Sequence, residues 1–262
     1  MRCLLFVPGD SERKLLRSAD SPADALILDL EDSVAPERKA AARALVRERL
    51  DAPRGAQALW VRINALDTPE HLADLAAVVG GRPAGVMLPK AAGDADVRRL
   101  DAYLSALEAR EGVEPGAIRV LVVATETGAA MFGLGSYTPA TPRLAGLTWG
   151  AEDLSTAVGA SSNSDEAGAY TPLYVLARSL CLAAAAAAET TAVDGVHTAL
   201  GDDEGLARAC RAARRDGFTA KLAIHPGQAP VILENFTPTA AELDHARAVV
   251  VAFEGATGVA RL

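Results

Sequence analysis

The apolar stretch Val120-Leu121-Val122-Val123-Ala124, with Glu126 two positions after it, is the part of the sequence that decides the fold. A second apolar run at residues 144–149 leads in the same way to Asp153, 27 positions after Glu126. That spacing is about one strand–helix unit of a parallel α/β fold. Neighbouring parallel strands would bring both acids to one edge of a sheet, where Mg²⁺ could bind between them. The alternative interpretation is that each acid only caps the helix that follows it.

Short apolar runs of this kind recur along the chain and alternate with longer amphipathic stretches. The runs are nearly continuous in apolar residues, which is typical of parallel strands buried on both faces. They lie at residues 3–7, 25–28, 58–61, 85–88, 120–124, 144–149, 191–193 and 222–224. Helices are predicted at residues 36–50, 69–79, 95–110 and 204–215, and from about Pro172. Thr68 is expected to cap one helix, and Thr239 to form a capping box with Glu242.

Eight strand–helix alternations in 262 residues favour a TIM (β/α)8 barrel, a fold of about 250 residues. An open, doubly wound sheet is the alternative. However, the turn after the first run, Pro8-Gly9-Asp10-Ser11, lacks the glycine-rich pattern of a dinucleotide-binding fold. No linker or change in composition interrupts the chain. The sequence therefore predicts a single α/β barrel, one catalytic domain over residues 1–262.

Composition argues against several classes of function. The formal net charge of −8 disfavours a nucleic-acid-binding surface, which would carry a basic stripe. No apolar run approaches the roughly 18 residues that suggest a membrane-spanning helix. Cys3, Cys181 and Cys210 are widely spaced without a metal-ligand pattern, which fits a reducing cytosol. We therefore expect a cytoplasmic protein whose partners are neither nucleic acids nor membranes.

Charged or polar residues follow nearly every predicted strand. In barrel enzymes the loops after the strands share one rim and form the active site. One such charge is more often only solvated, but a charge or polar group after seven of the eight strands indicates a site. The candidates are Asp29, Glu31, Asp32, Arg62, Lys90, Glu126, Glu152, Asp153, Asp194 and His225.

Arg62 and Lys90 are the cations expected on this rim. The planar guanidinium of Arg62 can hold a carboxylate or a developing enolate oxygen with two hydrogen bonds, whereas Lys90 supplies a point charge. A Schiff base at Lys90 is a weaker alternative. Together with two metal-binding carboxylates, these cations suit a small dianionic or keto-acid substrate. Among Asp29, Glu31 and Asp32, at least one acid is expected to neutralise Arg62 or Lys90.

One helix start and two single residues are further candidate substrate contacts. Gly150-Ala151-Glu152 opens a predicted helix, so its free N–H groups could bind a substrate carboxylate. Asp194 ends the seventh run at the rim, although it could instead fix the turn at Gly195. His225 follows the eighth run, and backbone hydrogen bonds beside Pro226 are an equal alternative for its ring.

Seven short segments, spread in order over nearly the whole chain, carry a resemblance to a known family. They are Leu5-Phe6-Val7-Pro8-Gly9, Asp29-Leu30-Glu31-Asp32-Ser33-Val34, Val61-Arg62-Ile63-Asn64, Leu88-Pro89-Lys90, Glu126-Thr127, Trp149-Gly150-Ala151-Glu152-Asp153-Leu154 and Ile224-His225-Pro226-x-Gln228. In these segments the chain resembles the citrate lyase β-subunit family. That family also includes the malyl-, citramalyl- and β-methylmalyl-CoA lyases of the HpcH/HpaI aldolase superfamily.

The resemblance implies a TIM barrel, usually assembled as a homotrimer or hexamer, with Mg²⁺ bound at the positions of Glu126 and Asp153. It also implies that Arg62 contacts an α-keto acid and that a CoA thioester enters across the same rim. The resemblance does not fix which acyl group the thioester carries. It does imply an activity, which the rim residues alone leave open.

The end of the chain differs from the pattern that this resemblance implies. Members of the family usually continue past the last helix into a short segment that carries an Asp, whereas this sequence stops at Leu262. If that Asp is the acid/base, we expect this chain to bind Mg²⁺ and a keto acid but to cleave CoA thioesters slowly. The alternative is that Asp29, Glu31 or Asp32 serves as the base.

The sequence and the resemblance together predict a Mg²⁺-dependent carbon–carbon lyase for a β-hydroxyacyl-CoA. A retro-Claisen cleavage would give an acyl-CoA and an α-keto acid, with Arg62, Asp29, Glu31 and Lys90 as the catalytic residues. One alternative is a Mg²⁺-dependent aldolase for free 2-keto-3-deoxy acids, without CoA. Another is a keto-acid-binding subunit that is active only within a larger complex.

Overall fold

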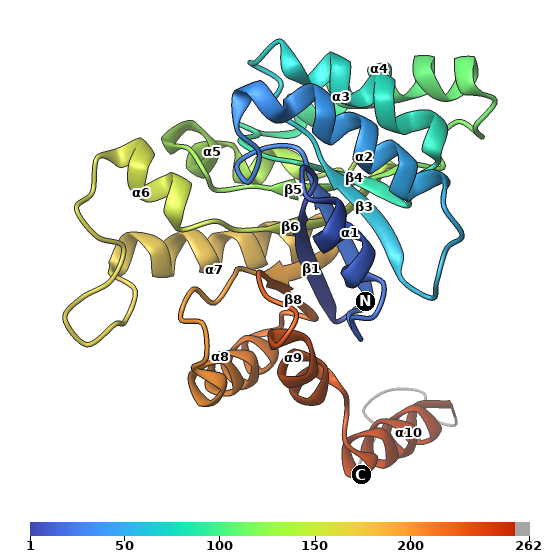
Figure 1. Ribbon diagram of the computed structural model, residues 1–262. Coiled ribbons are helices and arrows are strands. Elements are labelled where there is room, and N and C mark those ends of the chain that lie inside the picture. The colour runs from blue at the N-terminus through green and yellow to red at the C-terminus, as the bar shows by residue number, and fades with distance from the viewer. Residues whose placement is uncertain (255–262) are drawn as a thin grey trace.

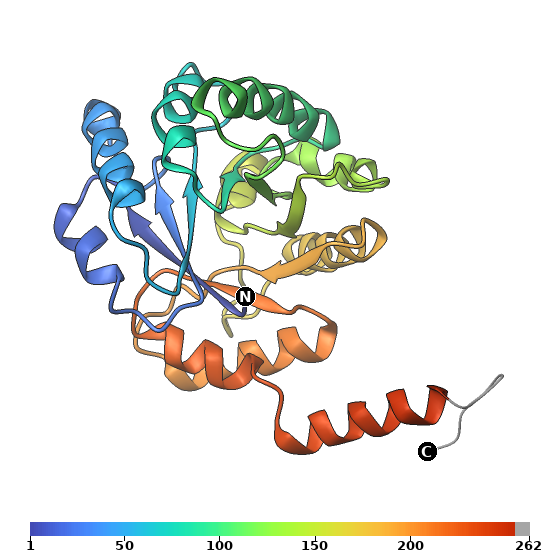
Figure 2. The same ribbon diagram turned by 90° about the vertical axis from the view of Figure 1, so that its right-hand side faces the viewer.

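Eight parallel strands form a closed barrel in the computed structural model, which describes residues 1–254 (Figures 1 and 2). Consecutive strands are neighbours around the barrel, and β8 closes it by pairing with β1. The strands are β1 Cys3–Pro8, β2 Ala25–Asp29, β3 Ala58–Arg62, β4 Gly85–Leu88, β5 Arg119–Val123, β6 Leu144–Thr148, β7 Thr191–Asp194 and β8 Ala220–Ala223. The predicted TIM barrel is confirmed.

The strand β8 differs most from its apolar run. It begins at Ala220, two residues before the predicted start, because Lys221 interrupts the apolar pattern. Lys221 is nevertheless buried, and its Nζ atom lies 2.7 Å from Oδ2 of Asp194 and 2.8 Å from the carbonyl oxygen of Gly195. Because the charge of Lys221 is paired inside the protein, a polar residue in the sequence belongs to a buried strand, and the apolar pattern alone placed the start of β8 too late.

Side chains fill the barrel interior beneath the rim. Strand residues alternate between the interior and the surrounding helices, and the interior set includes Ile27, Trp60, Met87 and Leu121. Gly85 leaves room for Trp60, because a Cβ atom at Gly85 would lie 2.2 Å from the indole ring. The barrel is thus closed from below, and a ligand site must open at the C-terminal ends of the strands.

Helices surround the barrel, as the view in Figure 2 shows most clearly. They are α1 Glu12–Ser18, α2 Lys39–Asp51, α3 Glu70–Val78, α4 Asp94–Glu111, α5 Gly128–Gly133, α6 Glu152–Val158, α7 Pro172–Ala187, α8 Asp203–Asp216, α9 Gln228–Phe236 and α10 Ala240–Glu254. Short 3-10 turns lie at Pro36–Arg38, Val79–Gly81 and Leu134–Tyr137. The helices predicted from the sequence are all present. The helix predicted at residues 36–50 begins with the 3-10 turn Pro36–Arg38 before α2, and the other predicted ends differ by at most one residue.

The two predicted helix caps have different outcomes. The capping box of α10 is confirmed, since the N–H of Thr239 donates to Oε2 of Glu242 and the N–H of Glu242 donates to Oγ1 of Thr239. The cap of α3 is wrong: Pro69 occupies the N-cap position. The hydroxyl of Thr68 instead donates to the carbonyl oxygen of Ala65, at 2.8 Å.

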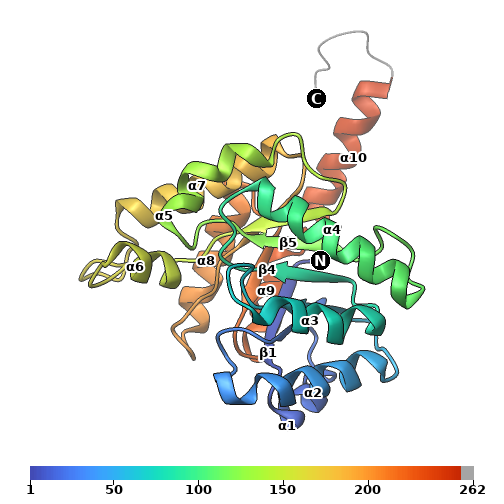
Figure 3. The same ribbon diagram turned by 90° about the horizontal axis from the view of Figure 1, so that it is seen from above.

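Helix α10 projects away from the barrel in all three ribbon views (Figures 1, 2 and 3). It carries exposed apolar side chains, namely Leu243, Val250, Val251 and Phe253. The expectation for the chain end falls on residues 255–262, which lie outside the described residues. Over residues 1–254, no helix combines the length and the apolar character needed to span a membrane. The single-domain assignment stays a prediction.

Candidate active site

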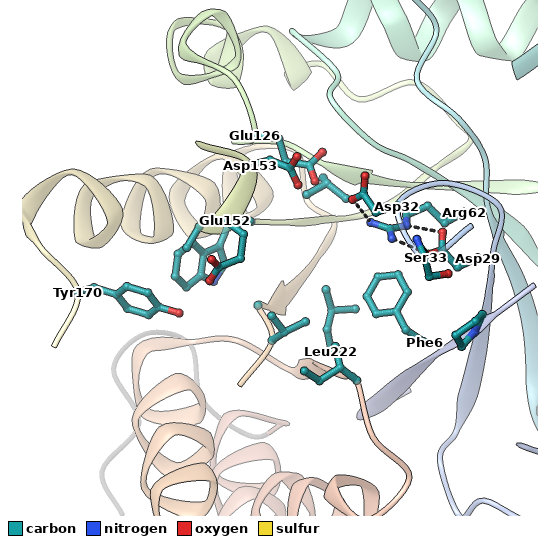
Figure 4. Close-up of a pocket in the computed structure, with 18 residues that line it drawn as sticks. Phe6, Asp29, Asp32, Ser33, Arg62, Glu126, Glu152, Asp153, Tyr170 and Leu222 are labelled. Carbon is teal, nitrogen blue, oxygen red and sulfur yellow. Dashed lines mark hydrogen bonds and ion pairs between the residues drawn. The ribbon is translucent and has the colours of Figure 1, made fainter. Parts of the chain in front are cut away.

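A cavity of about 400 Å³ opens at the C-terminal ends of the strands (Figure 4). Carboxylates and Arg62 line one part of its wall, and apolar side chains line another. Among the residues predicted from sequence, the cavity is lined by Asp29, Asp32, Arg62, Glu126, Gly150, Ala151, Glu152 and Asp153. The predicted rim therefore borders a cavity large enough for a small molecule.

Arg62 and Asp29 form a bidentate ion pair at the top of the barrel. They are partners in the register of β3 and β2, and Nε and Nη2 of Arg62 each donate to one oxygen of Asp29 at 2.7 Å. The guanidinium also lies over the ring of Phe6, 4.8 Å from its centre. Burial alone would raise the pKa of Asp29, but Arg62 and further hydrogen bonds hold this pKa below its ordinary value. Asp29 is thus ionised and fixes the orientation of Arg62.

Glu31 lies between the two cations of the rim. Its carboxylate contacts Nζ of Lys90 directly, and its Oε2 atom lies 3.1 Å from Nη1 of Arg62. Asp32 bridges the same cations at 3.5 and 3.3 Å, with half of its side chain exposed. Burial raises the pKa of Glu31 to about 7, although Arg62 and Lys90 oppose the shift. A carboxyl group that titrates near neutrality therefore lies beside the cavity.

Glu126 and Asp153 both line the wall of the cavity (Figure 4). Both contact Lys90: its backbone N–H donates to Oε2 of Glu126 at 2.6 Å, and its Nζ lies 3.3 Å from Oδ1 of Asp153. Lys90 adopts a left-handed backbone conformation, with φ of 54°. A residue with a side chain rarely adopts it, and the strain is of order 1–2 kcal/mol. Here that conformation directs the N–H of Lys90 toward Glu126.

The electrostatics of this wall favour a cation. Glu126 is only 4% exposed, and burial followed by the charge of Asp153 raises its pKa to about 8. Among residues 1–254, six carboxyl groups surround the site, against the two cations Arg62 and Lys90. They are Asp29, Glu31, Asp32, Glu126, Glu152 and Asp153. The excess of acid means that an anionic substrate would be repelled unless a metal cation were also bound.

The first turn of α6 forms the wall next to Glu126. Gly150 allows the close approach, because a Cβ atom there would lie 3.2 Å from Cγ of Glu126. The N–H of Gly150 donates to Oγ1 of Thr125 at 3.2 Å, and Ala151 is the N-cap residue. Oε1 of Glu152 accepts a hydrogen bond from Nδ2 of Asn163. Substrate binding by Gly150, Ala151 and Glu152 stays a prediction.

Residues 2–226 match the HpcH/HpaI aldolase/citrate lyase family. The chain belongs to this family. The resemblance seen in the seven sequence segments is therefore confirmed, and the match spans every strand of the barrel.

Relatives in this family act on CoA thioesters. A (3S)-malyl-CoA thioesterase from Cereibacter sphaeroides is 34% identical over 256 residues, which cover 97% of this chain and 84% of that protein. An L-malyl-CoA/beta-methylmalyl-CoA lyase from the same organism is 33% identical over 273 residues, with 97% and 85% coverage. The crystal structure of CitE from Mycobacterium tuberculosis contains magnesium, acetoacetate and coenzyme A. It matches with a TM-score of 0.80 and 34% identity, covering 100% of this chain and 90% of CitE.

Asp194 forms hydrogen bonds with three side chains of the same chain. It is 3% exposed and accepts hydrogen bonds from Lys221 at 2.7 Å, from Nε1 of Trp149 at 2.8 Å and from Arg178 at 3.0 Å. Burial would raise the pKa of Asp194, but Lys221 and Arg178 hold it below its ordinary value. The structure thus gives Asp194 the role of orienting the Trp149 ring at the cavity, and its predicted contact with substrate stays untested.

His225 is exposed, and it does not line the cavity within the described residues. Its Nδ1 atom accepts a hydrogen bond from the N–H of Gly227. Gln228 organises the end of β8 instead: its Oε1 accepts hydrogen bonds from the N–H groups of Ile224 and His225, and its Nε2 donates to the carbonyl oxygen of His197. Substrate binding by His225 stays a prediction.

Sequence reasoning missed the apolar residues of the cavity. Phe6, Val123 and Leu222 belong to strands, and their hydrophobicity is what any barrel core requires. Tyr170 lies in the loop between α6 and α7, and its ring meets that of Trp149 edge-on, with 5.2 Å between the centres. The available signal was position alone, since Phe6, Val123 and Trp149 come at the ends of their runs.

Proposed function

We propose that this chain is a Mg²⁺-dependent carbon–carbon lyase that cleaves or condenses a β-hydroxyacyl-CoA such as citryl-, malyl- or citramalyl-CoA. The reaction would interconvert this thioester with an acyl-CoA and an α-keto acid, such as oxaloacetate, glyoxylate or pyruvate. The observation that carries the proposal is the acidic pair Glu126 and Asp153 in one cavity with the fixed guanidinium of Arg62. The relatives that act on CoA thioesters favour this reaction over an aldolase for free keto-deoxy acids.

The residues present fit a magnesium site. Over residues 1–254, no three His, Cys, Asp or Glu side chains gather into a complete metal cage. Mg²⁺ does not need one, because it commonly takes one or two carboxylates and completes its octahedron with water and substrate oxygens. Glu126 and Asp153 would supply those carboxylates; burial, and then the charge of Asp153, raises the pKa of Glu126 to about 8, and a bound cation would favour its ionised form. When bound, Mg²⁺ would supply a Lewis acid that polarises the substrate carbonyl.

Arg62 is proposed to hold the keto-acid part of the substrate. Its ion pair with Asp29 and its contact with Phe6 fix the guanidinium plane before substrate arrives. A preorganised cation stabilises negative charge that develops during cleavage without first having to reorient. Lys90 is the second cation of the rim. It contacts Glu126, Asp153 and Glu31 and so holds these three carboxyl groups in place.

The substrate hydroxyl must lose a proton in the cleavage direction, and we assign that proton to the pair Glu31 and Asp32. Asp32 lines the cavity, and Glu31 has a pKa of about 7, close to the optimum for a base at neutral pH. Arg62 and Lys90 each contact both acids and link them. Asp29 is less suited to this step, because Arg62 holds the pKa of Asp29 below its ordinary value, which makes it a weaker base than Glu31.

A homo-oligomer, trimeric or hexameric, is also proposed, together with a single barrel domain and a cytoplasmic location. Helix α10 supports the oligomer, because its exposed residues Leu243, Val250, Val251 and Phe253 would be buried only against another surface. Cys3, Cys181 and Cys210 are buried and free, as suits a reducing compartment. Sedimentation of the full chain would measure the oligomeric state.

Calorimetric titration with an α-keto acid, with and without acetyl-CoA and Mg²⁺, tests the proposed function. A lyase should turn over only when the keto acid, the acyl-CoA and Mg²⁺ are all present. Turnover that is indifferent to CoA would favour the aldolase, and binding without turnover would favour a subunit of a larger complex. Glu126→Ala should abolish the Mg²⁺-dependent signal, whereas the matched variant Glu48→Ala on α2 should leave it unchanged.

A further inference from the structure

The floor of the cavity, where the barrel interior begins, is apolar. It is formed by Phe6 from β1 and Leu222 from β8 (Figure 4), together with Val123 from β5 and Val196 after β7. These side chains pack on the interior cluster beneath, so the floor is closed. The acidic wall and the floor thus offer a substrate two different environments.

The closed floor decides which end of a substrate can face it. A CoA thioester is far larger than the cavity of about 400 Å³, so its tail must leave through the open rim. The carboxylate and the keto oxygen belong at Arg62 and at the Glu126–Asp153 pair, on the wall. The group left to face the floor is the side chain on the carbonyl carbon of the keto acid. This step rests on the proposed function.

The floor offers no counterion to a second carboxylate. Among the described residues that line the cavity, Arg62 is the sole cation, and Asp29, Glu31 and Asp32 already surround it. Lys221 is next to Leu222 in sequence, but its Nζ atom is held by Asp194 and Gly195. A carboxylate against Val123 and Leu222 would lose its hydration without gaining a partner.

We propose that the cavity selects α-keto acids whose side chain is a short alkyl group, and discriminates against those that carry a second carboxylate. Pyruvate and 2-oxobutanoate are the chemical class that fits, and oxaloacetate is the class that does not. Each methylene that reaches the floor should strengthen binding about fourfold, the equivalent of about 0.8 kcal/mol per buried CH₂. Leu222 and Val123 are therefore specificity-determining residues.

The test is calorimetric titration of the full chain at saturating Mg²⁺ with four acids: pyruvate, 2-oxobutanoate, oxaloacetate and 4-methyl-2-oxopentanoate. The last two have side chains of equal heavy-atom count, with two methyl groups in place of the carboxylate oxygens. We expect 2-oxobutanoate to bind about fourfold more tightly than pyruvate. We expect 4-methyl-2-oxopentanoate to bind at least tenfold more tightly than oxaloacetate.

Two variants locate the effect on the floor. Leu222→Lys should reverse the preference within the matched pair, because it places an ammonium group where the second carboxylate would lie. The milder Val123→Ala should remove most of the gain from pyruvate to 2-oxobutanoate, which keeps the test informative if Leu222→Lys fails to fold. The matched control is Val175→Ala, at an exposed position on α7 outside the cavity, which should leave all four affinities unchanged.

The outcomes separate this inference from the proposed function. Oxaloacetate binding as tightly as 4-methyl-2-oxopentanoate would overturn the inference and leave the proposed lyase intact. Equal affinities for pyruvate and 2-oxobutanoate would overturn it as well. If none of the four acids binds in the presence of Mg²⁺, the proposed function fails first, and the inference fails with it.

Discussion

Magnesium binding to the substrate-free protein should depend steeply on pH because of Glu126. Its carboxyl group is buried and has a pKa of about 8, whereas a metal ligand must be ionised. At pH 6 about 1% of such a group is ionised, and at pH 8 about half. The Kd for Mg²⁺ should therefore fall about 50-fold between pH 6 and pH 8, which corresponds to about 2.3 kcal/mol.

Isothermal titration in buffers of different ionisation enthalpy measures both the Kd and the protons released. Each Mg²⁺ should displace close to one proton at pH 7 and about half a proton at pH 8, because the raised pKa makes the metal-free site bind a proton in this range. Glu126→Gln should bind Mg²⁺ weakly and with little dependence on pH. The matched variant Glu152→Gln removes another carboxylate from the cavity and should keep the pH dependence of the wild type.

A Kd that stays constant from pH 6 to pH 8, with no proton released, would refute the reasoning. It would mean either that Glu126 is already ionised in the free protein or that the metal binds elsewhere. If Glu152→Gln lost the pH dependence and Glu126→Gln kept it, the carboxyl group that titrates with Mg²⁺ binding would be Glu152 and not Glu126. Each result can be read without any measurement of turnover.

Three further outcomes follow from the rim and the barrel. Arg62→Lys keeps the charge but loses the bidentate fork, so affinity for the keto acid should fall while affinity for free CoA holds; equal losses in calorimetry would place Arg62 elsewhere. Glu31→Gln should lower kcat by about 10²–10⁴-fold. In the wild type kcat should rise as the pH increases through about 7, and the variant should lose this rise. An unchanged pH profile would exclude Glu31 as part of the base. Asp194→Asn leaves Lys221 buried without a full countercharge, so denaturant unfolding should show a loss of about 3–5 kcal/mol, against less than about 1 kcal/mol for the exposed Asp216→Asn. Equal small losses for the two would remove Asp194 from the barrel's stabilising ion pairs.

The barrel could be predicted from the sequence because most of its strands are short, continuous apolar runs. Seven of the eight runs are apolar enough to be read directly, and Arg62 is the last residue of β3 while Glu126 lies three residues after β5. Closure of the barrel then carries these two groups to one rim, where both line the cavity, whereas His225 just after β8 does not line it within residues 1–254. The exception is β8, where the buried ion pair of Lys221 and Asp194 made a core strand look polar.

The contacts within the site could not be predicted in the same way. Lys90 stands out as a charge in the sequence, but nothing there signals that its backbone N–H would point at Glu126 in a left-handed conformation. Phe6 and Leu222 look like ordinary core residues, because a cavity floor and a packed core have the same hydrophobicity. Such features depend on three-dimensional packing between strands that are far apart in the chain.

Product analysis after incubation of malyl-CoA or citramalyl-CoA with the full chain and Mg²⁺ distinguishes cleavage of the carbon–carbon bond from hydrolysis of the thioester. We expect an α-keto acid and an acyl-CoA in equal amounts, with no free thiol, and loss of both products in Glu126→Ala. Release of free CoA thiol together with the intact hydroxy acid would contradict the account, since it would mean that the thioester bond breaks instead of the carbon–carbon bond.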